Sequence, residues 1–475
     1  MSIQPSAFKI QHSKFPRYER HRDSGVEWLG EVPAHWEVEK GKWLFTKMER
    51  PVRKEDGIVT AFRDGQVTLR SNRRTEGFTN AIKEHGYQGI RKGDLVIHAM
   101  DAFAGAIGIS DSDGKSTPVY AACVPRIGPR IGNAVQPLFY AYLLRYMANS
   151  GYIVTLAKGI RERSTDFRFN DFGGLQLPLP PKPEQDRIVA FLDEKTAQID
   201  ALIEKKQRQI ALLDELKQIR INRAVTRGIV NAECGMLNEH LSTSETSAFC
   251  THNSKFVPSG IEWIGEIPEH WEVKKLGHLG KVGNGSTPSR SNLSYWDRPD
   301  YPWLNSGSVH QGEIRAVEQH VSNLALRECH LPLVKPNSIV IAITGQGKTR
   351  GTAALLKIPA TINQHLAYVE IQDKSVIPEF AYLSISSQYH QLRAISESGS
   401  TKGALTCQGV KEFKITIPPG EEQTAIYKFC RTLQSTTSKA METEVQQIQS
   451  LKTLRSTFIA HAVTGKIKVR ESYND

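Results

Sequence analysis

The sequence predicts an α+β protein in which two globular domains of mixed helix and strand are separated by a pair of long antiparallel helices. Three observations support this fold class. The chain is an internal duplication, each copy ends in a long amphipathic stretch, and short strand and turn signals precede that stretch. At 475 residues, 39% of them hydrophobic, the chain can form more than one packed domain. The duplication further predicts an internal pseudo-two-fold relation between the copies.

Two stretches of the chain, residues 24–42 and 259–277, are nearly identical. They read SGVEWLGEVPAHWEVEKGK and SGIEWIGEIPEHWEVKKLG, and twelve of the nineteen aligned positions are the same at an offset of 235. We call them the tryptophan segments. A second repeat follows at an offset of 238, with LPLPPKPEQ at 177–185 and ITIPPGEEQ at 415–423. Each copy therefore consists of a tryptophan segment, a variable stretch and a P-P-x-x-E-Q motif.

A long helix is predicted after each P-P-x-x-E-Q motif. Apolar residues recur there at helical spacing, and proline before the first turn with glutamate in it is typical of a helix start. The first stretch, residues 184–226, would be roughly 65 Å long at 1.5 Å per residue. Such a helix cannot bury its apolar stripe alone, so we expect the two helices to pack together, although they could instead dimerise or cap their own domains. The residues expected in the helix-pair packing are Ile188, Leu192, Ile199, Leu202, Leu213, Leu216, Ile426, Ile448, Leu451 and Leu454.

These repeats divide the chain into six parts. We expect an N-terminal extension at 1–23, a first variable domain at 24–180, a central long helix region at 181–235, a linker at 236–258, a second variable domain at 259–418 and a C-terminal long helix region at 419–475.

Positive charge gathers in the two variable stretches. The chain has 61 Lys and Arg against 50 Asp and Glu, for a formal net charge of +11. Residues 43–176 hold nineteen basic against thirteen acidic residues, and residues 278–414 hold fourteen against ten. The variable domains are therefore the predicted binders of a polyanion such as DNA. Turn-then-strand signals occur at equivalent places in both, at residues 93–97 and 337–341.

Each of these predicted strands runs into a loop of small and polar residues that could approach a DNA groove closely. Gln, Lys and Arg side chains hydrogen bond well to adenine and guanine edges. An ordinary hairpin turn with solvated charges is the alternative for each residue. The candidate DNA-binding residues, in these loops and in other basic or polar segments of the variable domains, are Arg70, Arg73, Arg74, His98, Asp101, Arg161, Arg163, Ser286, Thr287, Arg290, Gln346, Lys348, Arg350, Asn363, Gln364 and Lys402.

Several classes of protein are disfavoured. The six cysteines lie far apart without a C-x-x-C pair, which argues against a zinc site and a disulfide framework and fits a reducing compartment. Residues 345–349 resemble the end of a phosphate-binding loop, but Ala342 stands where that loop needs glycine. No apolar signal core or membrane-length apolar run is present, so we expect a cytoplasmic protein without membrane contact. We find no motif for methyl transfer or strand cleavage and expect the chain to be non-catalytic.

The two variable stretches, each preceded by E-W-x-G-x-x-P-x-H-W-E-V and followed by P-P-x-x-E-Q and a helix, resemble the specificity (S) subunit of type I restriction-modification systems. The resemblance covers nearly the whole chain except the first twenty residues and the linker. The second variable domain follows the family pattern closely, with GSTPS at 285–289, Tyr295-Trp296 and Pro302-Trp303. The first departs from it, because MERP at 48–51 replaces the G-x-T-P loop.

The resemblance implies that each variable domain is a target recognition domain that reads one half of a bipartite site in double-stranded DNA. The helix pair, a short coiled coil, would set the spacer between the halves and dock two modification (M) subunits, and restriction (R) subunits would join them. S-adenosylmethionine, ATP and Mg would be bound by these partners, with no cofactor or metal in this chain. A standalone two-headed DNA-binding regulator is the alternative, and it would bind its site without partners.

Overall fold

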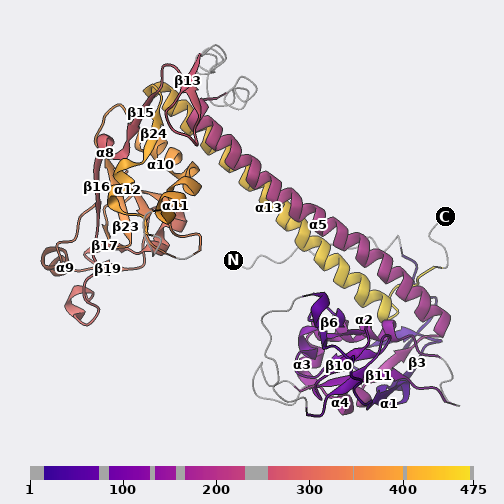
Figure 1. Cartoon of the computed structure of the whole chain (residues 1–475). Helices are drawn as coiled ribbons and strands as arrows, with labels where there is room; N and C mark the ends of the chain where they lie inside the picture. The colour runs from indigo at the N-terminus through magenta and orange to yellow at the C-terminus, as the bar shows by residue number, and fades with distance from the viewer. Residues whose placement is uncertain are drawn as a thin grey trace. The chain divides into compact units, whose positions relative to one another are not determined.

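The computed structural model describes residues 15–73, 85–128, 134–156, 166–229, 255–345, 347–398 and 404–470. The chain forms two compact units: unit 1 is Met1–Gln207 with Val445–Asp475, and unit 2 is Arg208–Glu444. Two long helices, α5 (Lys182–Arg227) and α13 (Gly420–Val463), each contribute one part to each unit (Figure 1). Within the described part of the chain, none of the helices combines the length and the apolar composition that a bilayer crossing requires.

Unit 1 folds the first variable stretch into short strands and helices. Its central sheet has four antiparallel strands in the order β4-β11-β8-β9, and two-stranded ladders join β1 to β2, β3 to β12, β5 to β6 and β7 to β10. In chain order the elements are β1 (His21–Asp23), β2 (Glu31–Pro33), β3 (Glu37–Lys40), α1 (Gly41–Leu44), β4 (Phe45–Met48), β5 (Val59–Ala61), β6 (Val67–Leu69), η1 (Arg70–Asn72), β7 (Gln88–Ile90), β8 (Leu95–His98), η2 (Ala102–Ala104), β9 (Ile107–Ile109), β10 (Gly114–Ser116), β11 (Tyr120–Pro125), α2 (Pro137–Asn149), α3 (Tyr152–Leu156), α4 (Phe169–Gly174) and β12 (Gln176–Leu179).

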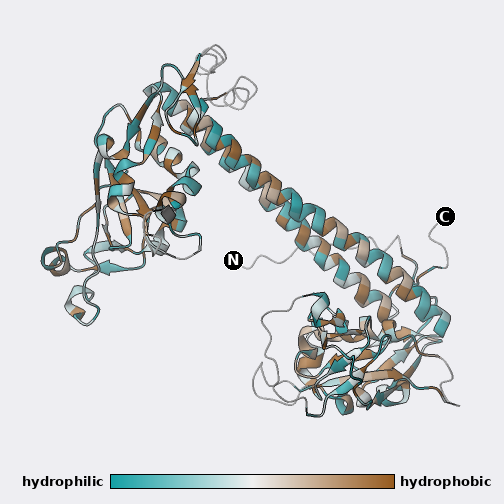
Figure 2. Cartoon of the chain, viewed as in Figure 1, coloured by the Kyte–Doolittle hydropathy of each residue, from teal (hydrophilic) through white to brown (hydrophobic). Residues whose placement is uncertain are grey.

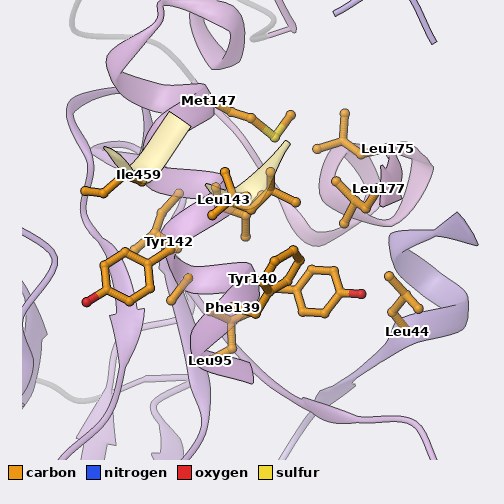
Figure 3. Close-up of a cluster of buried hydrophobic side chains, with 14 of the residues drawn as sticks. Leu44, Leu95, Phe139, Tyr140, Tyr142, Leu143, Met147, Leu175, Leu177 and Ile459 are labelled. Atoms are coloured by element: carbon orange, nitrogen blue, oxygen red, sulfur yellow. The ribbon is translucent and has the colours of Figure 1, made fainter. Parts of the chain in front are cut away.

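The core of unit 1 lies between its sheet and helix α2. Phe139, Tyr140 and Leu143 of α2 are fully buried together with Leu95 of β8. Ile459, near the end of α13, belongs to the same cluster, part of which is drawn in Figure 3. The variable domain and the helix pair therefore share one hydrophobic core in this unit.

Unit 2 repeats this plan with additions. Its central sheet has five strands in the order β16-β23-β20-β21-β18, and a three-stranded sheet, β19-β17-β22, lies outside it. In chain order the elements are β13 (Phe256–Pro258), β14 (Glu266–Pro268), β15 (Glu272–Lys275), α8 (Leu276–Leu279), β16 (Gly280–Asn284), η3 (Leu293–Tyr295), β17 (Tyr301–Leu304), η4 (Ser306–Gln311), β18 (Glu313–Ile314), β19 (His320–Val321), α9 (Asn323–Glu328), β20 (Ile339–Ala342), β21 (Ala353–Leu356), β22 (Thr361–Ile362), β23 (Leu366–Ile371), α10 (Pro378–Ser387), α11 (Tyr389–Ser398), α12 (Cys407–Glu412) and β24 (Lys414–Ile417).

The two repeated motifs of each copy contribute neighbouring strands that pair with each other. Strand β3 of the first tryptophan segment pairs antiparallel with β12, which precedes the first P-P-x-x-E-Q motif, so that Glu37 lies opposite Leu179. In unit 2, β15 and β24 pair in the same register, with Glu272 opposite Ile417. The internal duplication is thus confirmed in the fold, because the two ends of each variable domain are joined by the same backbone pairing.

The long helices pack against each other in antiparallel directions within each unit. In unit 1, Ile188 and Leu192 near the start of α5 share a cluster with Ala462 near the end of α13. In unit 2, Ala224 near the end of α5 packs with Ile426 near the start of α13. Figure 2 shows brown hydrophobic and teal hydrophilic residues alternating along both helices. The predicted pairing of the two helices inside one chain is therefore confirmed.

Two residues were wrongly placed in this packing by the sequence pattern. The side chains of Leu202 and Leu216 are 47% and 54% exposed. The partly buried residues in the middle of α5 are instead spaced three and four residues apart, and they include Lys206 and Lys217. The apolar stems of these two lysines can line an interface. Of the other expected packing residues, Ile188, Leu192, Ile199, Ile426 and Ile448 are buried, and Leu213, Leu451 and Leu454 are partly buried.

The glutamine of each P-P-x-x-E-Q motif ties the long helix to its variable domain. The Nε2 of Gln423 donates to the carbonyls of Ser375 at 2.8 Å and Pro418 at 2.7 Å, and its Oε1 accepts from the backbone N–H of Ile377 at 2.8 Å. Gln185 makes the equivalent three bonds in unit 1. Both glutamines are fully buried, so each satisfies backbone groups that water cannot reach.

The glutamate that precedes each of these glutamines binds side chains of the tryptophan segment or next to it. Glu422 pairs with His270 Nε2 at 2.7 Å and accepts from Trp271 Nε1 at 2.9 Å. In unit 1, Glu184 pairs with His35 at 2.9 Å but accepts its second bond from the Tyr18 hydroxyl. Burial raises the pKa of Tyr18, which therefore remains a neutral donor. The N-terminal extension thus takes part in the core of unit 1, a role that the sequence pattern did not predict.

Replacement of Gln423 should destabilise unit 2. We expect Gln423→Ala to cost roughly 3 kcal/mol of folding free energy, because it leaves two carbonyls and one N–H buried without partners. Thermal unfolding of the full chain, followed by circular dichroism, measures this as a lower Tm. Gln408→Ala, which removes an exposed glutamine of the same unit, is the matched control and should change stability by less than about 0.5 kcal/mol. Equal Tm values for the two variants would contradict the role assigned to Gln423.

Candidate nucleic-acid interface

Three loops of unit 2 that carry predicted DNA-binding residues come together in space. The hydroxyl of Thr287 donates to Gln364 Oε1, which joins the loop after β16 to the loop between β22 and β23. His365 of this second loop hydrogen bonds through Nδ1 to Thr344 Oγ1 at 2.7 Å, which joins it to the loop after β20. His310 in η4 reaches Thr349 at 3.1 Å. Polar side chains from four segments therefore form one surface.

The loop after β16 is held through its backbone. Gly285 lies so close to β22 that an added Cβ would sit 1.8 Å from the carbonyl oxygen of Ile362. Ser286 N–H donates to the same oxygen at 3.1 Å, and Trp303 Nε1 donates to the Ser286 carbonyl at 3.3 Å. Trp296 Nε1 donates to the carbonyl of Ser289 at 3.1 Å. Glycine is needed at 285 because only a residue without Cβ permits this approach.

The loop after β20 is supported by helix α11. Arg393 donates to the carbonyl of Gly347 at 2.5 Å, and the hydroxyl of Tyr389 donates to the carbonyl of Lys348 at 3.3 Å. The Lys348 side chain is exposed and that of Arg350 is half-buried. The backbone is thus fixed while the basic side chain of Lys348 faces solvent.

Asn363 has a supporting position in this surface. Its side chain is 4% exposed, and its Oδ1 accepts from the N–H of His365 at 3.0 Å. This bond shapes the turn that presents Gln364 and His365, both of which are exposed.

In unit 1, four predicted residues gather around Tyr120 and the β5–β6 hairpin. The ring centres of His98 and Tyr120 lie 4.4 Å apart, and Asp101 Oδ2 lies 3.3 Å from His98 Nδ1. Burial lowers the pKa of His98 although Asp101 acts in the opposite direction, so the imidazole is neutral near pH 7. Arg63, in the turn of the hairpin, pairs with Asp101 at 2.9 Å.

Arg70 and Arg73 lie directly after β6 of the same hairpin. Arg70 Nε donates to Thr60 Oγ1 at 3.4 Å, and the Arg73 guanidinium lies 4.2 Å from the Phe62 ring and 2.6 Å from Asp64. Burial would raise the pKa of Asp64, but the bond from Arg73 holds it below its usual value. The remaining predicted residues, Arg74, Arg161, Arg163, Gln346 and Lys402, lie outside the described residues.

The sequence did not predict several residues of these surfaces. No sequence motif marks Arg63 and Tyr120 in unit 1 or His310 and Gln319 in unit 2, which join these surfaces through side-chain contacts of the folded domains. Trp296 and Trp303 were visible as part of a pattern, but their contacts with the 285–290 loop could not be derived from spacing. Within the described ranges, His, Cys, Asp and Glu side chains do not gather in groups of three or more that could hold a metal ion.

Known proteins share sequence and fold with this chain. Residues 268–450 match the model of the type I restriction modification DNA specificity domain. The specificity subunit of the type I restriction enzyme HindI from Haemophilus influenzae is 23% identical over 412 residues, which cover 80% of this chain and 87% of that protein. The chain is thus similar to the specificity subunits of type I restriction enzymes.

Further similarities agree with this family. The specificity subunit of EcoR124I/EcoR124II from Escherichia coli is 26% identical over 180 residues, which span 38% of this chain and only 44% of that relative. A solved structure described as "Structural basis underlying complex assembly and conformational transition of the type I R-M system" covers 91% of this chain and 98% of its own, with a TM-score of 0.63 at 16% identity. At this identity the structural match shows a shared fold.

The close approach at Gly285 can be tested directly. We expect Gly285→Ala to displace the 285–290 loop, because the new Cβ would overlap the Ile362 carbonyl, and to change the tryptophan emission of the full chain. Gly420→Ala adds the same methyl group at a position of unit 2 with nothing within 4 Å and should leave the emission unchanged. A Gly285→Ala variant with wild-type emission and Tm would show that the loop tolerates a side chain there.

Proposed function

We propose that this chain is the DNA-recognition subunit of a type I restriction-modification complex, and that each unit reads one half of a bipartite site. The observation that carries the proposal is the repetition of a candidate interface. In both units predicted residues lie at or after the ends of equivalent strands. His98 ends β8 and Asp101 follows it, and Lys348 and Arg350 follow β20. Two similar surfaces on one chain are what recognition of two half-sites requires.

The charge of these domains suits DNA. The basic excess of the chain is concentrated in residues 43–176 and 278–414, which form most of the variable domains. Lysine and arginine contacts to phosphate supply affinity without sequence information, and side chains that reach base edges supply specificity. The exposed loop residues Lys348 and Gln364 are placed for the two roles respectively.

We further propose that the chain is non-catalytic and that adenine methylation belongs to modification subunits bound to its helices. Leu212, Leu216 and Ile219 of α5 are each more than half exposed. Their spacing of four and three residues puts them on one face of the helix, beside the line that packs on α13. An exposed apolar stripe beside an existing helix pair suits docking of another helix, and we assign it to a modification subunit.

A methylation map tests the recognition role. A host without other adenine methylation would express a modification subunit encoded in the same genome, with and without this chain. We expect N6-methyladenine at a split motif with a fixed gap only when both proteins are present, with one modified adenine in each half-site. Methylation of the same sites by the modification subunit alone would contradict the proposal. A chain that binds the motif tightly by itself while no methylation appears would favour an independent DNA-binding regulator.

A second experiment tests the docking surface. We expect the double substitution Leu212→Asp and Leu216→Asp to weaken binding of the modification subunit at least tenfold, because two apolar side chains and their buried area are lost from the interface. Ala211→Asp introduces one such charge at an exposed position off this stripe and serves as the control. Binding can be measured by surface plasmon resonance with the full chain, whose circular dichroism reports on folding. Unchanged affinity in the folded double variant would exclude this stripe as the docking site.

A further inference from the structure

Arg290 occupies an unusually well-defined position for an exposed arginine. Its guanidinium carbon lies 3.8 Å from the centre of the Trp296 ring and 5.4 Å from that of Trp303. The two indole rings meet edge to face, with centres 5.2 Å apart. Trp303 is buried in a small cluster of unit 2, so the aromatic support beneath Arg290 is part of the folded domain.

The orientation of the guanidinium within its plane is also fixed. Its Nη2 donates to Gln319 Oε1 at 3.0 Å. Stacking uses the face of the group, whereas all five N–H donors of an arginine point outward in its plane. The bond to Gln319 takes up one of these donors and prevents rotation on the tryptophan. The edge of the guanidinium is thereby presented in a single direction.

The same tryptophans fix the backbone that carries Arg290. As described above, Trp296 and Trp303 donate to carbonyls of Ser289 and Ser286 in the loop. Side chain and backbone are therefore held by one pair of residues. A group ordered before binding loses little conformational entropy when it binds, so it contributes more affinity and discriminates geometry more sharply.

A polar hollow adjoins this arginine. It has a volume of about 510 Å³, and its lining includes Trp303 and Gln319, both of which contact Arg290. Asn305, Ser308 and Gln311 supply further hydrogen-bonding side chains. Arg290 thus lies at the rim of a concave surface whose chemistry matches the edges of nucleic-acid bases.

We propose that Arg290, held by Trp296 and Gln319, reads a guanine in the half-site recognised by unit 2. A planar guanidinium presented edge-on matches the O6 and N7 acceptors of guanine in the major groove. A phosphate contact can be made by a flexible cation such as lysine, which acts as a point charge and does not need this degree of orientation. The inference rests on the proposed function and adds a specific residue and a specific base to it.

Methylation of synthetic duplexes provides the test. The full chain in complex with its modification subunit would be given the mapped site and duplexes in which each guanine of that half-site is replaced in turn. We expect wild type to prefer guanine at one position and Arg290→Ala to reduce that preference by between about 5-fold and 150-fold. The other half-site should be read as before. Trp296→Leu should reduce the preference at the same position by a smaller factor.

Controls separate base reading from other roles. Arg298→Ala removes an exposed arginine of the same segment and should leave the preference intact. Arg290→Lys retains the positive charge, so it should keep overall binding while losing preference for guanine. A uniform loss of methylation on all duplexes, restored by lysine, would identify a phosphate contact and overturn the proposal. A changed preference at an A·T position would likewise overturn it.

The two proposals fail in different ways. A wild-type complex that produces no split motif would refute the recognition role of the chain and, with it, the reading of guanine. A wild-type complex that methylates a split motif with no change in Arg290→Ala would refute the assignment of Arg290 alone. Circular dichroism of each variant in the full chain establishes that the comparison is made between folded proteins.

Discussion

The buried glutamine at the start of each long helix is the interaction on which the arrangement of each unit depends. Gln185 and Gln423 each bond to the turn that begins the helix and to backbone groups beside the first turn of a domain helix, α2 or α10. The adjoining glutamate binds the tryptophan segment, which pairs as a strand with the residues before the same motif. A helix can position a domain only if the joint between them does not rotate, and these bonds remove that freedom.

Much of this fold could be predicted because its strongest signals are local. The long helices follow from periodicity over many turns, and strands β8 and β20 follow from the turns before them. Gly93 and Asn337 in those turns adopt left-handed backbone conformations, with φ of 90° and 66°, which few other residue types accept. The pairing of the tryptophan segment with the P-P-x-x-E-Q region was hidden, since neither segment indicates its partner.

Where a prediction was wrong or missing, the cause was tertiary contacts between segments that are distant in the sequence. Leu202 and Leu216 are more hydrophobic than Lys206 and Lys217, so a pattern based on hydrophobicity selects the leucines, yet the geometry of the helix pair covers the lysine positions. Tyr18 replaces in unit 1 a bond that a tryptophan makes in unit 2, which no comparison of the two copies anticipates. Arg290 was a candidate among many arginines. Its support by Trp296 and Gln319 depends on contacts that only the folded domain creates.

The loops of the unit 2 interface are secured largely through main-chain atoms. The carbonyls of Ser286, Ser289, Gly347 and Lys348 accept the bonds that hold them, and the donors are tryptophan, tyrosine and arginine side chains outside the exposed tips. A carbonyl is common to every amino acid, so substitution at a loop tip leaves its anchorage in place. Mutational drift at a position such as Lys348 can then alter the chemistry of the surface without unfolding the domain. A scaffold of this kind is able to diversify its ligand preference one residue at a time.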